Sequence, residues 1–214
     1  MGRWTRRCSW TPQRADGVFV RARCPIFVKI ILMDRDGTIS MPLGLGIYLK
    51  CWESFAFRED TVVAMEELAA DGFSFIVLTN QAGIGHGIVE QDEADRIHQR
   101  MTVELADRGV PILETYCCPD LPGSGSPMRK PAPGMFLQAA RDHEFLLDQV
   151  LYVGDDIRDC HAAAAAGCGM ILLGDRSSVD GVPPNSRLDL VRSSLGDALP
   201  EIRQFYGLEV GSQL

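Results

Sequence analysis

The chain has 214 residues, 46% of them hydrophobic, so it can bury a full core and is most simply one folded domain. Its apolar runs are far shorter than the roughly 20 residues of a membrane-spanning helix, so we expect no membrane association. The net charge is −8, and because residues 1–33 are basic the rest carries −14, which disfavours a nucleic-acid partner.

Residues 1–33 hold seven Lys and Arg against one acidic residue. Within this segment, residues 1–25 mix Arg, Trp, Pro and Gly without periodicity, which predicts a basic and poorly ordered extension. We place the single folded domain at 26–214. No apolar signal segment follows the adjacent Arg6 and Arg7, so we expect a cytoplasmic protein.

From residue 26 onward, predicted strands and helices alternate. Short, almost uniformly apolar runs predict buried strands at 26–33, 73–78, 111–117, 150–153 and 170–173. Apolar residues at helical spacing predict helices over 60–72, 92–108, 133–144, 157–166 and 194–206. Irregular or Gly-, Pro- and Ser-rich stretches predict loops at 39–58, 82–87 and 119–128.

This alternation predicts a parallel sheet with helices on both faces, the doubly wound Rossmann-like α/β architecture. In such sheets, ligands bind outside the carboxyl ends of the strands. Four polar sets fall at that edge: Asp34 with Asp36, Thr79 with Asn80, Asp155 with Asp156, and, ahead of the fourth strand, Arg129 with Lys130. Because unrelated turns would have no reason to converge there, we interpret the four sets as one site.

The residue types at this edge favour phosphoryl chemistry. Clustered carboxylates need a cation, and a small set of oxygen ligands suits Mg²⁺ shared with a substrate phosphate. Lys130 and the Thr79 hydroxyl are complementary donors for phosphoryl oxygens. One carboxylate can attack phosphorus to form an aspartyl-phosphate, while the second protonates the leaving oxygen and later deprotonates water.

Four short motifs lie in this order between residues 29 and 173: Asp34-Arg35-Asp36-Gly37-Thr38, Thr79-Asn80-Gln81, Arg129-Lys130-Pro131, and Gly154-Asp155 with Asp159 four residues on. With them the chain resembles the haloacid dehalogenase-like phosphohydrolases. The resemblance implies Asp34 as nucleophile, Asp36 as general acid/base, and Mg²⁺ held by Asp34, the Asp36 carbonyl and Asp155. The implied phosphate ligands are Thr79, the Asn80 amide and Lys130.

The segments DRDGT, TNQAGIG and RKPAPGM are similar to the corresponding motifs of the branch that contains heptose 1,7-bisphosphate and histidinol-phosphate phosphatases. Members of that branch have minimal caps, which fits the short 39–58 loop. The resemblance therefore implies a phosphomonoesterase of carbohydrate metabolism acting on a small phosphorylated metabolite, a sugar bisphosphate ahead of histidinol phosphate.

Two features depart from that branch. Many members carry a Cys and His zinc loop before the RKP motif, but here Cys117 and Cys118 remain and Met128 stands where a Cys is usual, so we expect no zinc. His86 stands where the heptose enzymes usually have Arg, so we expect a second substrate anion to be held differently.

Several roles stay open at this point. Asp156 and Asp159 compete as the further carboxylate that supports the metal, and Arg129 is either a second phosphate contact or a packing residue at a helix start. His86 is equally a substrate contact or a solvated side chain. Alternation along the strand points Arg35 away from the site. The remaining His residues are expected to be structural: His98, His143 and His161.

Two other functional classes share this chemistry. A receiver-like phospho-acceptor domain also uses Asp, Thr and Lys around Mg²⁺, but its acceptor follows the third strand, whereas Asp34 follows the first. A polynucleotide-end phosphatase is disfavoured by the acidic body. The seven scattered cysteines indicate free thiols in a reducing compartment, and we expect a monomer or small homo-oligomer.

Overall fold

The computed structural model describes residues 29–44, 46–175, 177, 180, 182 and 189–208. The predicted extension 1–25 and the first three residues of the first predicted strand lie outside the described residues.

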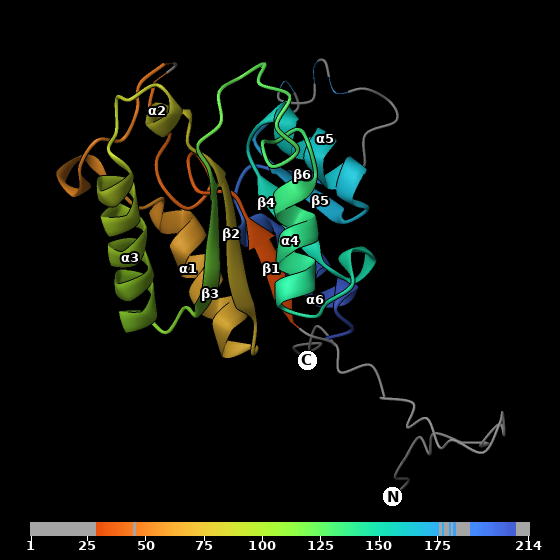
Figure 1. Cartoon of the computed structure of the whole chain (residues 1–214). Helices are drawn as coiled ribbons and strands as arrows, with labels where there is room; N and C mark the ends of the chain where they lie inside the picture. The colour runs from red at the N-terminus through yellow and green to blue at the C-terminus, as the bar shows by residue number, and fades with distance from the viewer. Residues whose placement is uncertain are drawn as a thin grey trace, which may run out of the picture.

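Six parallel strands form one sheet in the order β3-β2-β1-β4-β5-β6 (Figure 1). The strands are β1 Ile30–Met33, β2 Ser74–Asn80, β3 Ile112–Cys118, β4 Leu151–Gly154, β5 Gly169–Leu173 and β6 Leu190–Arg192. The chain winds outward from β1 to β3, then returns to the other side of β1 to place β4. The predicted doubly wound fold is confirmed, and its switch point lies between β1 and β4.

Helices cover both faces of this sheet (Figure 1). They are α1 Glu59–Ala70, α2 Ala82–Gly85, α3 Gln91–Asp107, α4 Gly134–Asp142, α5 Ile157–Ala166 and α6 Leu199–Phe205. Short 3-10 turns occupy Trp52–Ser54, Leu147–Gln149 and Gly196–Ala198. Within the described part of the chain, no helix is both long and apolar enough to cross a membrane.

Alternation along the strands creates two separate core layers. On β1, Ile31 and Met33 pack in the layer that contains α1, α3 and α6. Their neighbours Ile30 and Leu32 pack in the layer that contains α4 and α5. Because both faces of each central strand are buried, these strands are uniformly apolar until the polar residues at their carboxyl ends.

The structure differs from the predicted elements in three places. Strand β2 continues through Thr79 and Asn80, because both residues pair with β3 and extend the ladder into the polar motif. A short helix, α2, occupies part of the predicted glycine-rich loop. Strand β6 was not predicted, since three residues carry too little periodicity to be recognised.

Candidate active site

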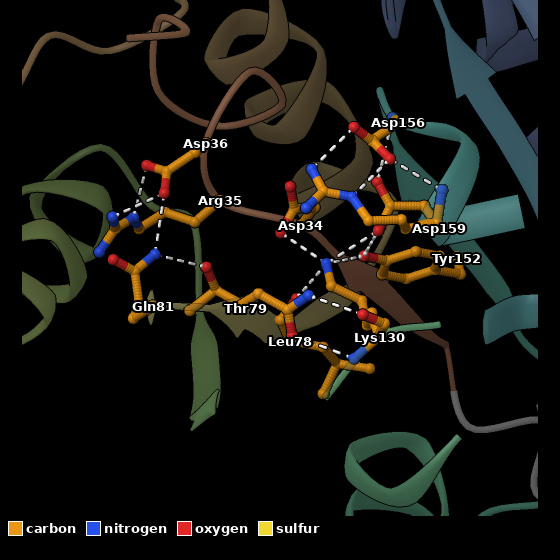
Figure 2. A network of polar contacts seen from close by, with 12 residues as sticks. Asp34, Arg35, Asp36, Leu78, Thr79, Gln81, Lys130, Tyr152, Asp156 and Asp159 are labelled. Carbon is orange, nitrogen blue, oxygen red and sulfur yellow. Dashed lines mark hydrogen bonds and ion pairs between the residues drawn. The ribbon is translucent and has the colours of Figure 1, made fainter. Parts of the chain in front are cut away.

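Polar side chains from the carboxyl ends of β1, β2 and β4, from the loop before α4 and from the first turn of α5 converge at the carboxyl edge of the sheet (Figure 2). They line a cavity of about 560 Å³, one wall of which comes from the loop between β1 and α1. The cavity therefore lies at the switch point, where the polar motifs predict a site.

Lys130 is the buried cation of this cavity, with 3% of its surface exposed. Its ammonium Nζ lies 2.7 Å from Asp34 Oδ1 and 2.8 Å from Asp159 Oδ1. It also donates to the Leu78 carbonyl at 2.8 Å and to the Tyr152 hydroxyl at 2.6 Å. Tyr152 in turn donates to Asp159 Oδ1 at 2.9 Å. Lys130 thus ties the end of β1 to the first turn of α5.

Asp34, Asp155 and Asp159 form an acidic cluster whose nearest oxygens all lie within 4.8 Å of one another. Burial raises the pKa of Asp34 to about 7 although Lys130 opposes the shift. Burial, together with the charges of Asp159 and Asp156, raises the pKa of Asp155 to about 7. The Lys130 ammonium contacts two of these three clustered carboxylates, so the donor set is suited to a divalent cation such as Mg²⁺.

Asp156 and Asp159 have different surroundings. The Asp156 carboxylate caps α5 and binds the Arg158 side chain through Nε and Nη2, both at 2.8 Å. Asp159 instead lies in the acidic cluster, and its Oδ2 accepts from the Asp156 amide at 3.1 Å. This geometry favours Asp159 as the carboxylate that supports the metal. Arg158 also lines the cavity, and sequence reasoning missed it.

Asp36 faces a different set of donors from those around Asp34 (Figure 2). Its carboxylate accepts from Arg35 Nε at 2.9 Å and Nη2 at 2.8 Å, from Gln81 Nε2 at 2.8 Å, and from Ser40 Oγ at 3.3 Å. Burial raises the pKa of Asp36, but the charge and hydrogen bonds of Arg35, with those of Gln81 and Ser40, outweigh it and leave that pKa below its usual value.

The expectation that Arg35 points away from the site is wrong. Strand β1 ends at Met33, so strand alternation no longer fixes the direction of Arg35, and its side chain turns back onto Asp36. The Arg35 carbonyl accepts the amides of Ile39 and Ser40, each at 2.9 Å, which closes the turn behind the motif.

The Thr79-Asn80-Gln81 motif contacts both Asp36 and Lys130, the lysine that binds the acidic cluster. Gln81 Nε2 donates to Thr79 Oγ1 at 2.8 Å as well as to Asp36, so the Thr79 hydroxyl keeps its own hydrogen to donate. The Asn80 side chain accepts from the Lys130 amide and donates to the Lys130 carbonyl, both at 3.0 Å. Asn80 therefore fixes Lys130, and its role toward phosphate stays a prediction.

Arg129 lines the cavity beside Lys130. Its Nη1 donates to the Asp120 carbonyl at 2.8 Å, and burial and the positive charge of Arg158 lower its pKa. A guanidinium held by a neutral carbonyl, near a second guanidinium, is suited to an anionic ligand.

Cys117 and Cys118 are not placed to bind one metal ion together. Cys117 and Cys118 are successive residues of β3, so their side chains leave opposite faces of the strand. Cys118 is buried against α4, with Sγ 3.5 Å from Asp120 Oδ2, and burial raises the pKa of Cys117 to about 12. Among the described residues, the acidic cluster is the one group of three or more His, Cys, Asp or Glu side chains that is placed to hold a metal ion.

Gly37 lets the first motif approach the acidic cluster. Its φ is +84°, and a Cβ on it would lie 2.0 Å from Asp155 Oδ2. We expect Gly37→Ala to displace Asp155 and to weaken Mg²⁺ binding at least tenfold, in addition to about 1–2 kcal/mol of backbone strain. Gly109→Ala is the matched control, because Gly109 has φ +78° and a Cβ at that position would have no neighbour within 4 Å.

Calorimetric Mg²⁺ titration and urea unfolding of both variants check this prediction. The control is expected to lose similar stability and to keep its Mg²⁺ affinity. Equal Mg²⁺ affinities for the two variants would contradict the assigned contact.

Residues 29–166 match the family model described as polynucleotide kinase 3 phosphatase. A D-glycero-beta-D-manno-heptose-1,7-bisphosphate 7-phosphatase of Yersinia pestis is 33% identical over 186 residues, covering 84% of this chain and 97% of the relative. The chain belongs to the haloacid dehalogenase-like phosphatases. The relative of the same name from Escherichia coli K12 is 36% identical, covering 81% of this chain and 93% of the relative.

A solved haloacid dehalogenase-like phosphatase has the same fold. The crystal structure of D,D-heptose 1,7-bisphosphate phosphatase from B. bronchiseptica, complexed with magnesium and phosphate, superposes with a TM-score of 0.73. It is 30% identical and covers 82% of this chain and 98% of that one. The predicted family and fold are thereby confirmed.

Proposed function

We propose that this protein is a Mg²⁺-dependent phosphatase that removes one phosphate from a small sugar bisphosphate, with heptose 1,7-bisphosphate as the first candidate. The observation that carries the proposal is the acidic cluster, which binds the Lys130 ammonium, together with the nearby Asp36 carboxylate, which is bound by Arg35 instead. The names of the relatives and the magnesium and phosphate in the related crystal structure support it.

In the proposed reaction, the Asp34 carboxylate attacks phosphorus and the bond from phosphorus to the leaving oxygen breaks. Asp36 donates a proton to that oxygen. Asp36 then takes a proton from water, which attacks the phosphorus and frees Asp34. Lys130 and the Thr79 hydroxyl hold the phosphoryl oxygens. Asp34, the Asp36 carbonyl and Asp155, with Asp159 in support, would hold a Mg²⁺ ion, which would supply charge neutralisation for the phosphoryl group.

A phosphate-release screen tests the function. The purified protein is offered heptose 1,7-bisphosphate, other sugar phosphates, histidinol phosphate and a 3′-phosphorylated oligonucleotide, with Mg²⁺ and with EDTA. The oligonucleotide is included because of the description of the matching family model. We expect Mg²⁺-dependent release, fastest from the bisphosphate. No release by a folded, Mg²⁺-loaded protein would overturn the proposal.

Arg129 is our candidate for holding the second phosphate. We expect Arg129→Met to raise KM for the bisphosphate by about 10- to 100-fold, because a charge-assisted pair is lost, and to change KM for a monophosphate far less. Arg141→Met is the control, since Arg141 is exposed on α4. Equal effects on both substrates would assign Arg129 to packing at the start of the helix.

Mg²⁺ binding is expected to release protons below about pH 7. The pKa of Asp34 and of Asp155 is about 7 in the folded metal-free protein and 3.8 without the fold, so both bind protons between these values. The contribution of these two carboxyls to the stability of the metal-free protein should therefore fall as pH rises from 4 to 7, while Mg²⁺ affinity should rise and level off above 7. Calorimetry in two buffers of different ionisation enthalpy measures the released protons, and equal affinities at pH 5.5 and 7.5 would contradict this.

We also propose that residues 26–214 act as a single cytoplasmic domain of carbohydrate metabolism, as a monomer or small homo-oligomer. Among the described residues, Cys51, Cys117, Cys118 and Cys160 are free thiols, which supports a reducing compartment. A small metabolite is preferred over nucleic acid as the partner because of the acidic body of the chain.

A further inference from the structure

A buried pair, Arg35 and His98, lies behind the carboxylate of Asp36. Arg35 and His98 are 1% and 7% exposed. Arg35 Nε and Nη2 bind the two oxygens of Asp36, and Arg35 Nη1 lies 2.7 Å from His98 Nε2. Neither residue belongs to the acidic cluster, and the proposed reaction leaves both without a role.

The direction of each hydrogen bond follows from chemistry. Arg35 can only donate, so His98 Nε2 is the acceptor and the imidazole proton is on Nδ1. Burial and the charge of Arg35 lower the pKa of His98 to about 4, consistent with a neutral ring. Arg35 is therefore the donor on both sides: it donates to His98 through Nη1 and to Asp36 through two parallel bonds.

Helix α3 holds His98 in a fixed position behind Arg35. His98 lies on the buried face of α3 with Ile97, Met101 and Leu105. A guanidinium with three of its nitrogens engaged cannot turn without leaving a buried polar group unpaired. The planar fork of Arg35 therefore fixes both oxygens of Asp36, and Gln81 fixes one of them from the other side of the carboxylate.

The fixed orientation of Asp36 matters because this residue lies only two positions after Asp34, a member of the acidic cluster. A free carboxylate there could rotate toward Lys130 or a bound cation, where it would be lost for proton transfer. We propose that Arg35, backed by His98, is the positioning residue that aims Asp36 at the leaving oxygen. This role rests on the proposed phosphatase reaction, in which Asp36 is the acid/base.

Dependence on the leaving group separates this role from a merely structural one. p-Nitrophenolate leaves without a proton, whereas phenolate, as basic as a tyrosine side chain, needs protonation. The two aryl phosphates have nearly the same shape, so the ratio of their kcat/KM values reports how well Asp36 is aimed. Hydrolysis of the two aryl phosphates can be measured whichever sugar phosphate is the natural substrate.

We expect Arg35→Met to lower kcat/KM by about 100-fold for phenyl phosphate and about 10-fold for p-nitrophenyl phosphate, a tenfold shift in the ratio. His98→Leu should shift the ratio in the same direction by about threefold, and His98→Gln, which keeps an acceptor near Nε2, should restore it. Met101→Ala, on the same buried face of α3, is the control: it should lower the unfolding free energy and leave the ratio unchanged.

A wild-type ratio in folded Arg35→Met and His98→Leu would overturn the positioning role. If Arg35→Met does not fold, the comparison of His98→Leu with His98→Gln decides the question alone. Failure of the proposed substrate has a different signature, because the wild-type protein would then hydrolyse both aryl phosphates and leave heptose 1,7-bisphosphate intact.

Discussion

Asp34→Asn is expected to lower steady-state phosphate release by about 10⁴-fold or more, because an amide cannot form the aspartyl-phosphate. The same substitution should be nearly neutral for stability. Lys130 keeps its contact with Asp159, and the new amide oxygen can still accept from the ammonium. We expect the unfolding free energy to change by less than about 1 kcal/mol, since one carboxylate is removed from a crowded acidic cluster.

Asp36→Asn is the informative control for that variant. It retains Asp34, so it should still transfer phosphate from p-nitrophenyl phosphate to the protein, but without a base to activate water it should accumulate the phosphorylated form. A burst of p-nitrophenolate followed by slow turnover measures this. Asp34→Asn that retains turnover would exclude Asp34 as nucleophile, and slow stoichiometric labelling of the wild-type protein would favour a receiver-like domain.

Much of the site could be predicted from sequence because its residues stand where strands end. The backbone direction of a buried parallel strand is fixed, so Asp34, Thr79 and Asp155 had to meet at one edge of the sheet once the strands were recognised. Lys130 was found for a related reason, since its motif opens the segment that leads into α4.

The contacts that could not be predicted from the sequence are made by long side chains or join residues of different elements. Arg35 was set aside on strand alternation, a rule that stops applying one residue after β1 ends. His98 is expected to be structural because it lies on a helix away from the sheet edge, and nothing in the sequence indicates its contact with Arg35. Arg158 follows Asp156 by two residues, a spacing that allows the observed ion pair without requiring it.

Lys130→Met is expected to cause the largest loss of stability among these variants. It leaves Asp34 and Asp159 buried without their ammonium, and removing one partner of such a buried network costs about 3–5 kcal/mol. The Leu78 carbonyl and the Tyr152 hydroxyl lose the same donor. Catalysis should fall as well, because the ammonium that orients Asp34, the proposed nucleophile, is gone.

The pH dependence of that loss identifies its cause. The pKa of Lys130 is raised above 10.5 in the folded protein, so in the wild type its charge stabilises the fold throughout pH 5 to 8. In Lys130→Met the pKa of Asp34 and of Asp155 must rise further, since Lys130 lowers both. Protonation at low pH then relieves the unpaired charge, so urea unfolding should show a smaller loss of unfolding free energy at pH 5 than at pH 8.

Lys29→Met, which removes a partly buried ammonium bound to the Asp71 carbonyl, should show no such pH dependence. A Lys130→Met loss equal at both pH values would mean that packing around the lysine stem, and not its charge, stabilises the acidic cluster.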